Sequence, residues 1–131
     1  MAQHFHAIVW IDHHEARIFH FNATDVERDI VRPHDPNVHV HHKANTVGSG
    51  HAPIDHDFFR RVTDAIAKAG AVMIVGPSTA KTELATFIAE QNSALSARVA
   101  TVEAVDHPTD NELVAQARRF FRANDRMRQI V

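Results

Sequence analysis

Histidines are concentrated in one segment of this 131-residue chain, between Pro33 and Pro53. Within it, His39 and His41 would point to the same side of an extended strand, about 6–7 Å apart, and His42 follows directly. Imidazoles at this spacing can bind one transition metal. We expect that the protein has no cofactor and that these histidines face solvent or RNA. The alternative is a metal site for zinc or another divalent transition metal at His39, His41 and His42. Further metal ligands would come from Asp35, His51 or His56.

The same segment is polar, and loops of this length in compact domains are usually functional or disordered. Gly48 and Gly50 permit backbone conformations that are closed to other residues. The stretch Gly48, Ser49, Gly50 and His51 could therefore form a turn that approaches a phosphate, and Lys43 adds a positive charge nearby. A simple hinge is the alternative interpretation.

A second candidate is the sequence GPSTAKTEL at Gly76–Leu84, which follows an apolar run and starts a helix. The free N–H groups of a helix N-terminus favour anions, and Ser78 and Lys81 are close in sequence. The glycine and lysine spacing of a P-loop is missing, so helix capping is the simpler interpretation. Asp12 raises a nuclease as a further alternative, but a two-metal site needs several converging carboxylates and no such set stands out.

Arginines gather near the end of the chain, with Asp125 as the nearby acid. Such a run is typical of a solvated helix face whose charges suit the helix C-terminus. It could also contact RNA phosphates, and each such contact would be sensitive to salt. The arginines are Arg118, Arg119, Arg122, Arg126 and Arg128.

Composition limits the function classes. The formal net charge is −2, so no overall positive field attracts nucleic acid. There is no cysteine, which excludes disulfides and thiolate chemistry. No secretory signal is visible, and the longest apolar run is far short of the ~20 residues that a membrane span needs. We therefore expect a cytoplasmic protein with no membrane partner.

The order of elements follows from periodicity. Three short runs are typical of strands joined by tight turns, at 7–11, 16–21 and 26–31. After the segment at 33–53 the pattern alternates between helix and strand. A helix is expected from Pro53 to Ala69 with Gly70 as its C-cap, and another begins at Ser78 or Thr79. The last helix begins at Thr109, which forms a capping box with Glu112. The intervening strands are expected at 71–76 and 97–102.

This β-β-β-α-β-α-β-α order predicts one α/β domain over residues 1–131. An antiparallel meander extended by parallel strands, with helices on both faces, gives a three-layer, ribonuclease-H-like mixed sheet. The segment at 33–53 is then a long His-rich loop of that domain.

VWIDHHEARIF, the Gly-containing loop and VMIVGPSTAKTEL together resemble the middle domain of archaeal and eukaryotic peptide-chain release factors. Pelota-type ribosome-rescue proteins and stand-alone bacterial relatives share that domain. In release factors the long loop carries a Gly-Gly-Gln tip, and the corresponding tip here is Gly48–His51, which lacks the glutamine.

The resemblance implies a non-catalytic, translation-associated protein that binds the ribosome or structured RNA. The expected contact residues are Lys43, Gly48, Ser49, Gly50, His51, Arg118, Arg119 and Arg122. One alternative is a His-loop metal-binding protein or metal-dependent hydrolase. Another is a homo-oligomer that the loop assembles.

Overall fold

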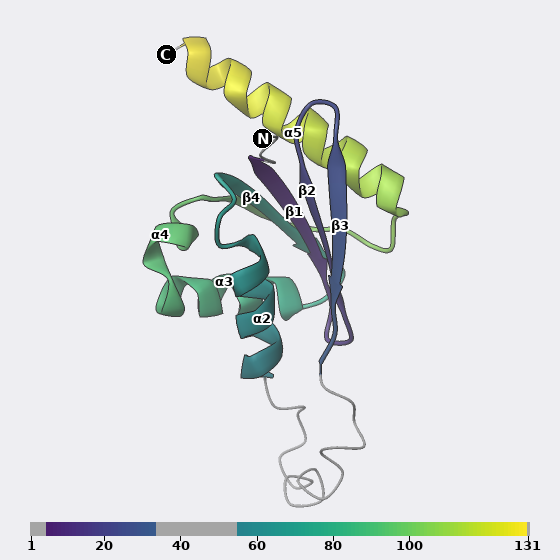
Figure 1. Cartoon of the computed structure of the whole chain (residues 1–131), viewed down its shortest axis with the longest axis vertical. Helices are drawn as coiled ribbons and strands as arrows, with labels where there is room; N and C mark the ends of the chain where they lie inside the picture. The colour runs from purple at the N-terminus through teal and green to yellow at the C-terminus, as the bar shows by residue number, and fades with distance from the viewer. Residues whose placement is uncertain (1–4, 34–54, 131) are drawn as a thin grey trace, which may run out of the picture.

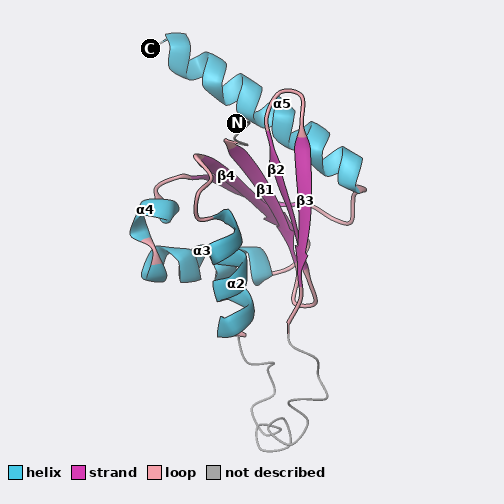
Figure 2. Cartoon of the chain, viewed as in Figure 1, coloured by secondary structure: helices cyan, strands magenta, loops and turns pink. Residues whose placement is uncertain are grey.

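The computed structural model describes residues 5–33 and 55–130, with side chains to Ala123 (Figures 1 and 2). The His-rich segment predicted at 33–53 lies almost entirely outside these residues. A meander comes first, and its strands are β1 (His6–Ile11), β2 (Ala16–Phe21) and β3 (Val26–Val31). The rest of the chain forms α2 (His56–Ile66), β4 (Ala71–Gly76), α3 (Ala80–Gln91), α4 (Ser93–Ser96), β5 (Val99–Ala104) and α5 (Asp110–Ile130).

The strands form one mixed sheet in the order β3-β2-β1-β4-β5. β1 pairs antiparallel with β2, and β2 antiparallel with β3, whereas β4 is parallel to both β1 and β5. Short polar side chains close the two hairpin turns. Asp12 Oδ1 accepts the N–H groups of His14 and Glu15, and Asn22 makes the equivalent contacts in the second turn. The predicted meander and its parallel extension are therefore confirmed.

Helices cover both faces of the sheet, which gives the three predicted layers (Figure 1). Because successive side chains of a strand point to opposite faces, β1 contributes to two separate cores. Val9 and Ile11 pack beneath α2 and α3, whereas Ile8 and Trp10 pack beneath α5. Trp10 is 1% exposed and belongs to the core beneath α5.

The helix after the His-rich segment is shorter than predicted. Asp55 caps its start by accepting the N–H of Phe58, and the helix ends at Ile66 rather than at Ala69. Gly70 is not its C-cap, so that prediction was wrong. The guanidinium of Arg98 instead donates hydrogen bonds to the carbonyl oxygens of Ala67 and Ala69 just past the helix end.

Gly70 instead lies against Phe5, just before β4. Its N–H donates to the Phe5 carbonyl at 2.7 Å, and a Cβ at this position would meet the outer edge of the Phe5 ring, a side chain that is 56% exposed and has room to move. Two other differences follow in the chain: the short helix α4 was not predicted, and the last strand covers 99–104 rather than 97–102.

The start of α5 agrees with the sequence. The Thr109 N–H donates to Glu112 Oε1 at 2.8 Å, and the Glu112 N–H donates to Thr109 Oγ1 at 3.2 Å. This reciprocal pair is the predicted capping box. Among the described residues, no helix combines the length and apolar character that crossing a membrane requires.

Candidate functional site

Many of the predicted contact residues lie outside the described part of the chain. These are Lys43, Gly48, Ser49, Gly50 and His51, together with the predicted metal ligands His39, His41 and His42. Within residues 5–33 and 55–130, no three histidine or carboxylate side chains are grouped so that they could hold a metal ion. The metal site thus stays a prediction for the segment that the structure does not describe.

The predicted arginines of α5 divide into two kinds. Arg118 is half-buried and joins α5 to the β2–β3 turn. Its Nε donates to the Asn22 carbonyl at 3.3 Å, its Nη2 donates to the Asp25 carbonyl at 3.2 Å, and its guanidinium lies 5.8 Å from the centre of the Phe21 ring. Arg119 and Arg122 are exposed. Arg118 therefore joins the helix to the sheet, and Arg119 and Arg122 present their charges to solvent.

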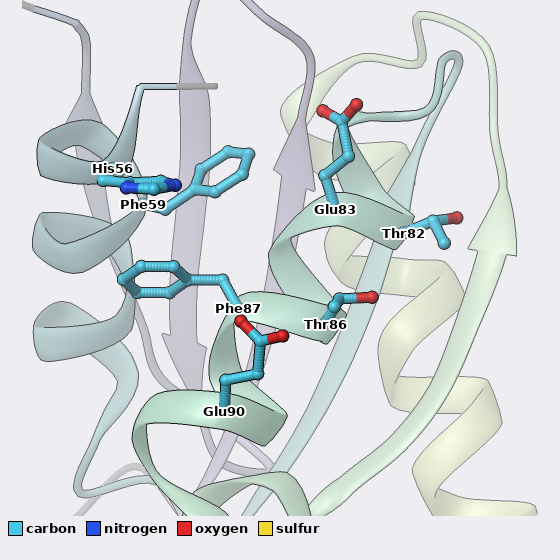
Figure 3. Close-up of a pocket in the computed structure, with 7 residues that line it drawn as sticks. All are labelled: His56, Phe59, Thr82, Glu83, Thr86, Phe87 and Glu90. Atoms are coloured by element: carbon cyan, nitrogen blue, oxygen red, sulfur yellow. The ribbon is translucent and has the colours of Figure 1, made fainter. Parts of the chain in front are cut away.

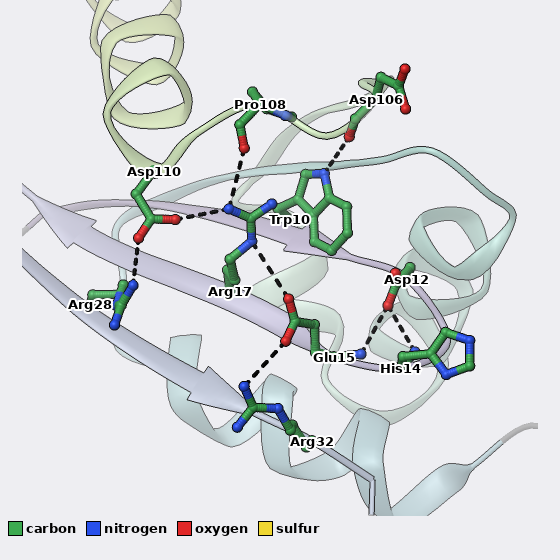
Figure 4. A network of polar contacts seen from close by, with 10 residues as sticks. All are labelled: Trp10, Asp12, His14, Glu15, Arg17, Arg28, Arg32, Asp106, Pro108 and Asp110. Atoms are coloured by element: carbon green, nitrogen blue, oxygen red, sulfur yellow. Dashed lines mark hydrogen bonds and ion pairs between the residues drawn. The ribbon is translucent and has the colours of Figure 1, made fainter.

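An ionic network holds the beginning of α5 against the sheet (Figure 4). Arg17 of β2 donates to Asp110 Oδ1 at 2.8 Å and to the Pro108 carbonyl at 3.3 Å. Arg28 of β3 donates to Asp110 Oδ2 at 2.5 Å, so one carboxylate joins two strands to the helix. The Arg17 guanidinium also lies 4.5 Å from the centre of the Trp10 ring, in a cation–π contact.

The charges in this network determine how Asp110 titrates. Partial burial on its own would raise the pKa of Asp110, but hydrogen bonds from Arg28 and Arg17, and the charges of both guanidinium groups, hold that pKa below its ordinary value. Asp110 is therefore a carboxylate at neutral pH. It fixes the direction in which α5, with Arg119 and Arg122, leaves the sheet.

The sequence did not predict the Arg17–Asp110 contact. The one available signal was an arginine on the same strand face as Phe19 and Phe21, where a charge needs a partner. Trp10 is fixed in the same region because its Nε1–H donates to the Asp106 carbonyl at 2.7 Å.

In the segment at Gly76–Leu84, α3 begins after Thr79, whose side chain makes no capping hydrogen bond, and Ser78 Oγ accepts the Ala80 N–H at 3.5 Å. The Lys81 ammonium donates to the Ser78 carbonyl at 2.6 Å, so it is held by the turn itself. Gly76 is required where β4 ends, because a Cβ there would lie 2.2 Å from the Ile11 carbonyl oxygen. Asp12 accepts the turn hydrogen bonds described above and joins no carboxylate cluster in the described residues.

A hollow of about 260 Å³ lies between α2 and α3 (Figure 3). Rings from both helices line it: Phe87 of α3 lies 5.9 Å from Phe59 and 5.9 Å from His56, measured between ring centres. Two carboxylates, Glu83 and Glu90, come from α3. Thr82 and Thr86 complete the lining. His56, and the segment that contains Thr82 and Glu83, had been considered from the sequence for other sites, but the hollow itself was not predicted because it forms where two separate helices meet.

No protein-family model matches this sequence, and no curated protein matches it at a significant level. Solved structures do show the same fold. Pelota from Archaeoglobus fulgidus matches 87% of this chain with a TM-score of 0.62 at 14% sequence identity. Pelota from Thermoplasma acidophilum matches 85% with a TM-score of 0.60 at 17% identity.

An archaeal translation termination factor, aRF1, matches 95% of this chain with a TM-score of 0.52 at 13% identity. The chain spans 30% of each Pelota chain and 39% of the aRF1 chain. It is therefore similar to one part of these longer proteins. The predicted fold class, and the predicted resemblance to release and rescue factors, are confirmed at the level of the fold.

Proposed function

We propose that this protein is a non-catalytic, translation-associated protein that binds the ribosome or structured RNA. The observation that carries the proposal is the fold that it shares with two Pelota proteins and aRF1 over 85% to 95% of its length. The name of aRF1 gives translation termination as its function. We extend a role in translation to this chain on the basis of that shared fold.

The proposed contact surface includes α5. Arg119 and Arg122 are exposed on this helix, whose C-terminal part extends beyond the sheet (Figure 1). Two exposed guanidinium groups one turn apart suit a phosphate backbone, which is recognised mainly through its charge. Arg118, on the same helix, holds α5 to the β2–β3 turn.

The segment that the structure does not describe supplies the remaining contacts of the proposal. Lys43 and the stretch from Gly48 to His51 occupy the place in the sequence where the resemblance puts a release-factor tip. Because residues 33–53 contain no glutamine, we propose that this segment binds and does not hydrolyse.

Co-sedimentation with purified ribosomes across a salt series tests the proposal. We expect the full-length protein to pellet with ribosomes at low salt and to be released as the salt concentration rises, because phosphate contacts weaken as counterions compete. A protein that stays in the supernatant at every salt concentration, low salt included, would overturn the proposal.

A further inference from the structure

The hollow between α2 and α3 lies on the opposite face of the sheet from α5. Its helices cover the core that contains Val9 and Ile74, whereas α5 covers the core that contains Trp10 and Met73. The proposed RNA contacts on α5 therefore do not use this hollow. Its chemistry also differs from that of α5, and it needs a separate explanation.

The wall of the hollow is aromatic. Phe87 reaches from α3 toward α2, where the side chains of His56 and Phe59 lie (Figure 3). Phe59 is 2% exposed and forms the floor, whereas Phe87 is half-buried and keeps part of its ring accessible. The faces of aromatic rings carry partial negative charge and attract cations.

The rim of the hollow is acidic. Glu83 and Glu90 lie two turns apart on α3, about 10 Å along the helix axis. Glu83 Oε1 lies 2.9 Å from His13 Nε2, so its position is fixed, and Glu90 is exposed. Among the residues that the structure describes, no lysine or arginine lines the hollow. This arrangement repels phosphate groups and attracts a positive charge.

We propose that the hollow binds an arginine side chain presented by a basic segment of a partner protein. A guanidinium is planar, so it can stack on the Phe87 ring while its N–H groups donate to the Glu90 carboxylate, and Glu83 adds negative charge at the far end of the rim. At about 260 Å³ the hollow is smaller than typical small-molecule pockets of roughly 300–1,000 Å³. It therefore suits one side chain better than a cofactor. This proposal does not depend on ribosome binding.

The test is an NMR titration of the full-length ¹⁵N-labelled protein with the peptide Ac-Gly-Arg-Gly-NH₂. The matched neutral peptide carries citrulline, which keeps the shape of arginine but has no charge. We expect weak, saturable shifts in the backbone signals of the residues that line the hollow with the arginine peptide, and none of comparable size with the citrulline peptide. Equal responses to both peptides, or shifts that centre on α5, would overturn the proposal.

Two charge-matched variants make the test specific to the rim. Glu90→Gln removes an exposed carboxylate of the hollow, and Asp64→Asn removes an exposed carboxylate of α2 that does not line it. We expect the first to weaken binding of the arginine peptide by about 2- to 5-fold, the range for an exposed ion pair, and the second to leave it unchanged. Identical binding by the two variants would contradict the assigned site. Because both substituted positions are exposed, we expect both variants to fold.

Discussion

The position of α5 depends on Asp110, so replacing this residue by alanine should loosen the helix from the sheet. Asp110→Ala removes the shared acceptor of Arg17 and Arg28. It leaves the Arg17 guanidinium, whose side chain is 15% exposed, with the Pro108 carbonyl at 3.3 Å and Glu15 at 3.8 Å from its Nε. Neither contact replaces the lost carboxylate, so the variant should be less stable than the wild-type protein.

The size of the effect follows from the exposure of each pair. The mostly buried Arg17 pair contributes about 1–2 kcal/mol, and the Arg28 pair, with an arginine that is 53% exposed, contributes about 0–1 kcal/mol. We therefore expect the free energy of unfolding to fall by about 1–3 kcal/mol. For a chain of this length the melting temperature should fall by about 4–11 °C.

Urea denaturation followed by circular dichroism measures this loss, and Asp64→Ala is the control because Asp64 is an exposed acid of α2.

The difference in the free energy of unfolding between wild type and Asp110→Ala should also depend on pH. The pKa of Asp110 in the folded protein lies below the ordinary value of 3.8, so the unfolded chain binds this proton more tightly. The stabilisation is then present above about pH 4 and is lost as the pH falls through the folded-state pKa. A loss at pH 7 no larger than that of the control, or a difference that does not shrink in acid, would refute this reasoning.

Three further predictions concern the turn after β4, the start of α5 and the His-rich segment. Gly76→Ala should destabilise the protein by about 1–3 kcal/mol in urea denaturation, because the new Cβ would meet the Ile11 carbonyl oxygen; an unchanged urea midpoint would contradict the close approach. Thr109→Ala should cost about 1 kcal/mol in the same assay, whereas Thr109→Ser should retain most of the capping energy; equal losses would argue against the cap. His39→Ala/His41→Ala should leave the metal content of untagged protein unchanged, as measured by elemental analysis. A stoichiometric metal that this variant loses would favour the metal-binding alternative.

The sequence predicted those parts of the fold that depend on local chemistry. The runs of β1 and β4 are almost entirely apolar because both faces of these strands are buried, and β2 is apolar except at Arg17 and His20, so composition reveals all three. The Thr109 capping box lies within four residues, and its side chains act on their own backbone. Features of this kind can be read without knowledge of the tertiary structure.

The features that were missed depend on contacts between distant parts of the chain. Gly70 has the pattern of a helix C-cap, but its N–H is bonded to the carbonyl of Phe5, far earlier in the chain. The carbonyl oxygens just past the end of α2 accept hydrogen bonds from Arg98, about thirty residues further along the chain. Arg17 and Asp110 are separated by 93 residues, and no periodicity links them. The hollow likewise forms only where α2 and α3 meet, so the sequence of either helix taken alone does not predict it.

The central claim of a ribosome or RNA contact through α5 is tested most directly by equilibrium binding of two charge-matched double variants to purified ribosomes. Arg119→Gln/Arg122→Gln removes the exposed arginines of α5. Arg60→Gln/Lys68→Gln removes two exposed basic residues in and after α2, which covers the other face of the sheet.

If each α5 arginine meets one phosphate, the first variant should lower the slope of log affinity against log salt concentration by about 1.4–1.8. At about 0.1 M salt it should then bind ribosomes about 25- to 60-fold more weakly than the wild-type protein. This difference in affinity should disappear as the salt concentration approaches roughly 1 M. The second variant should bind like wild type. Equal losses in the two variants, or no loss in the first, would contradict the account.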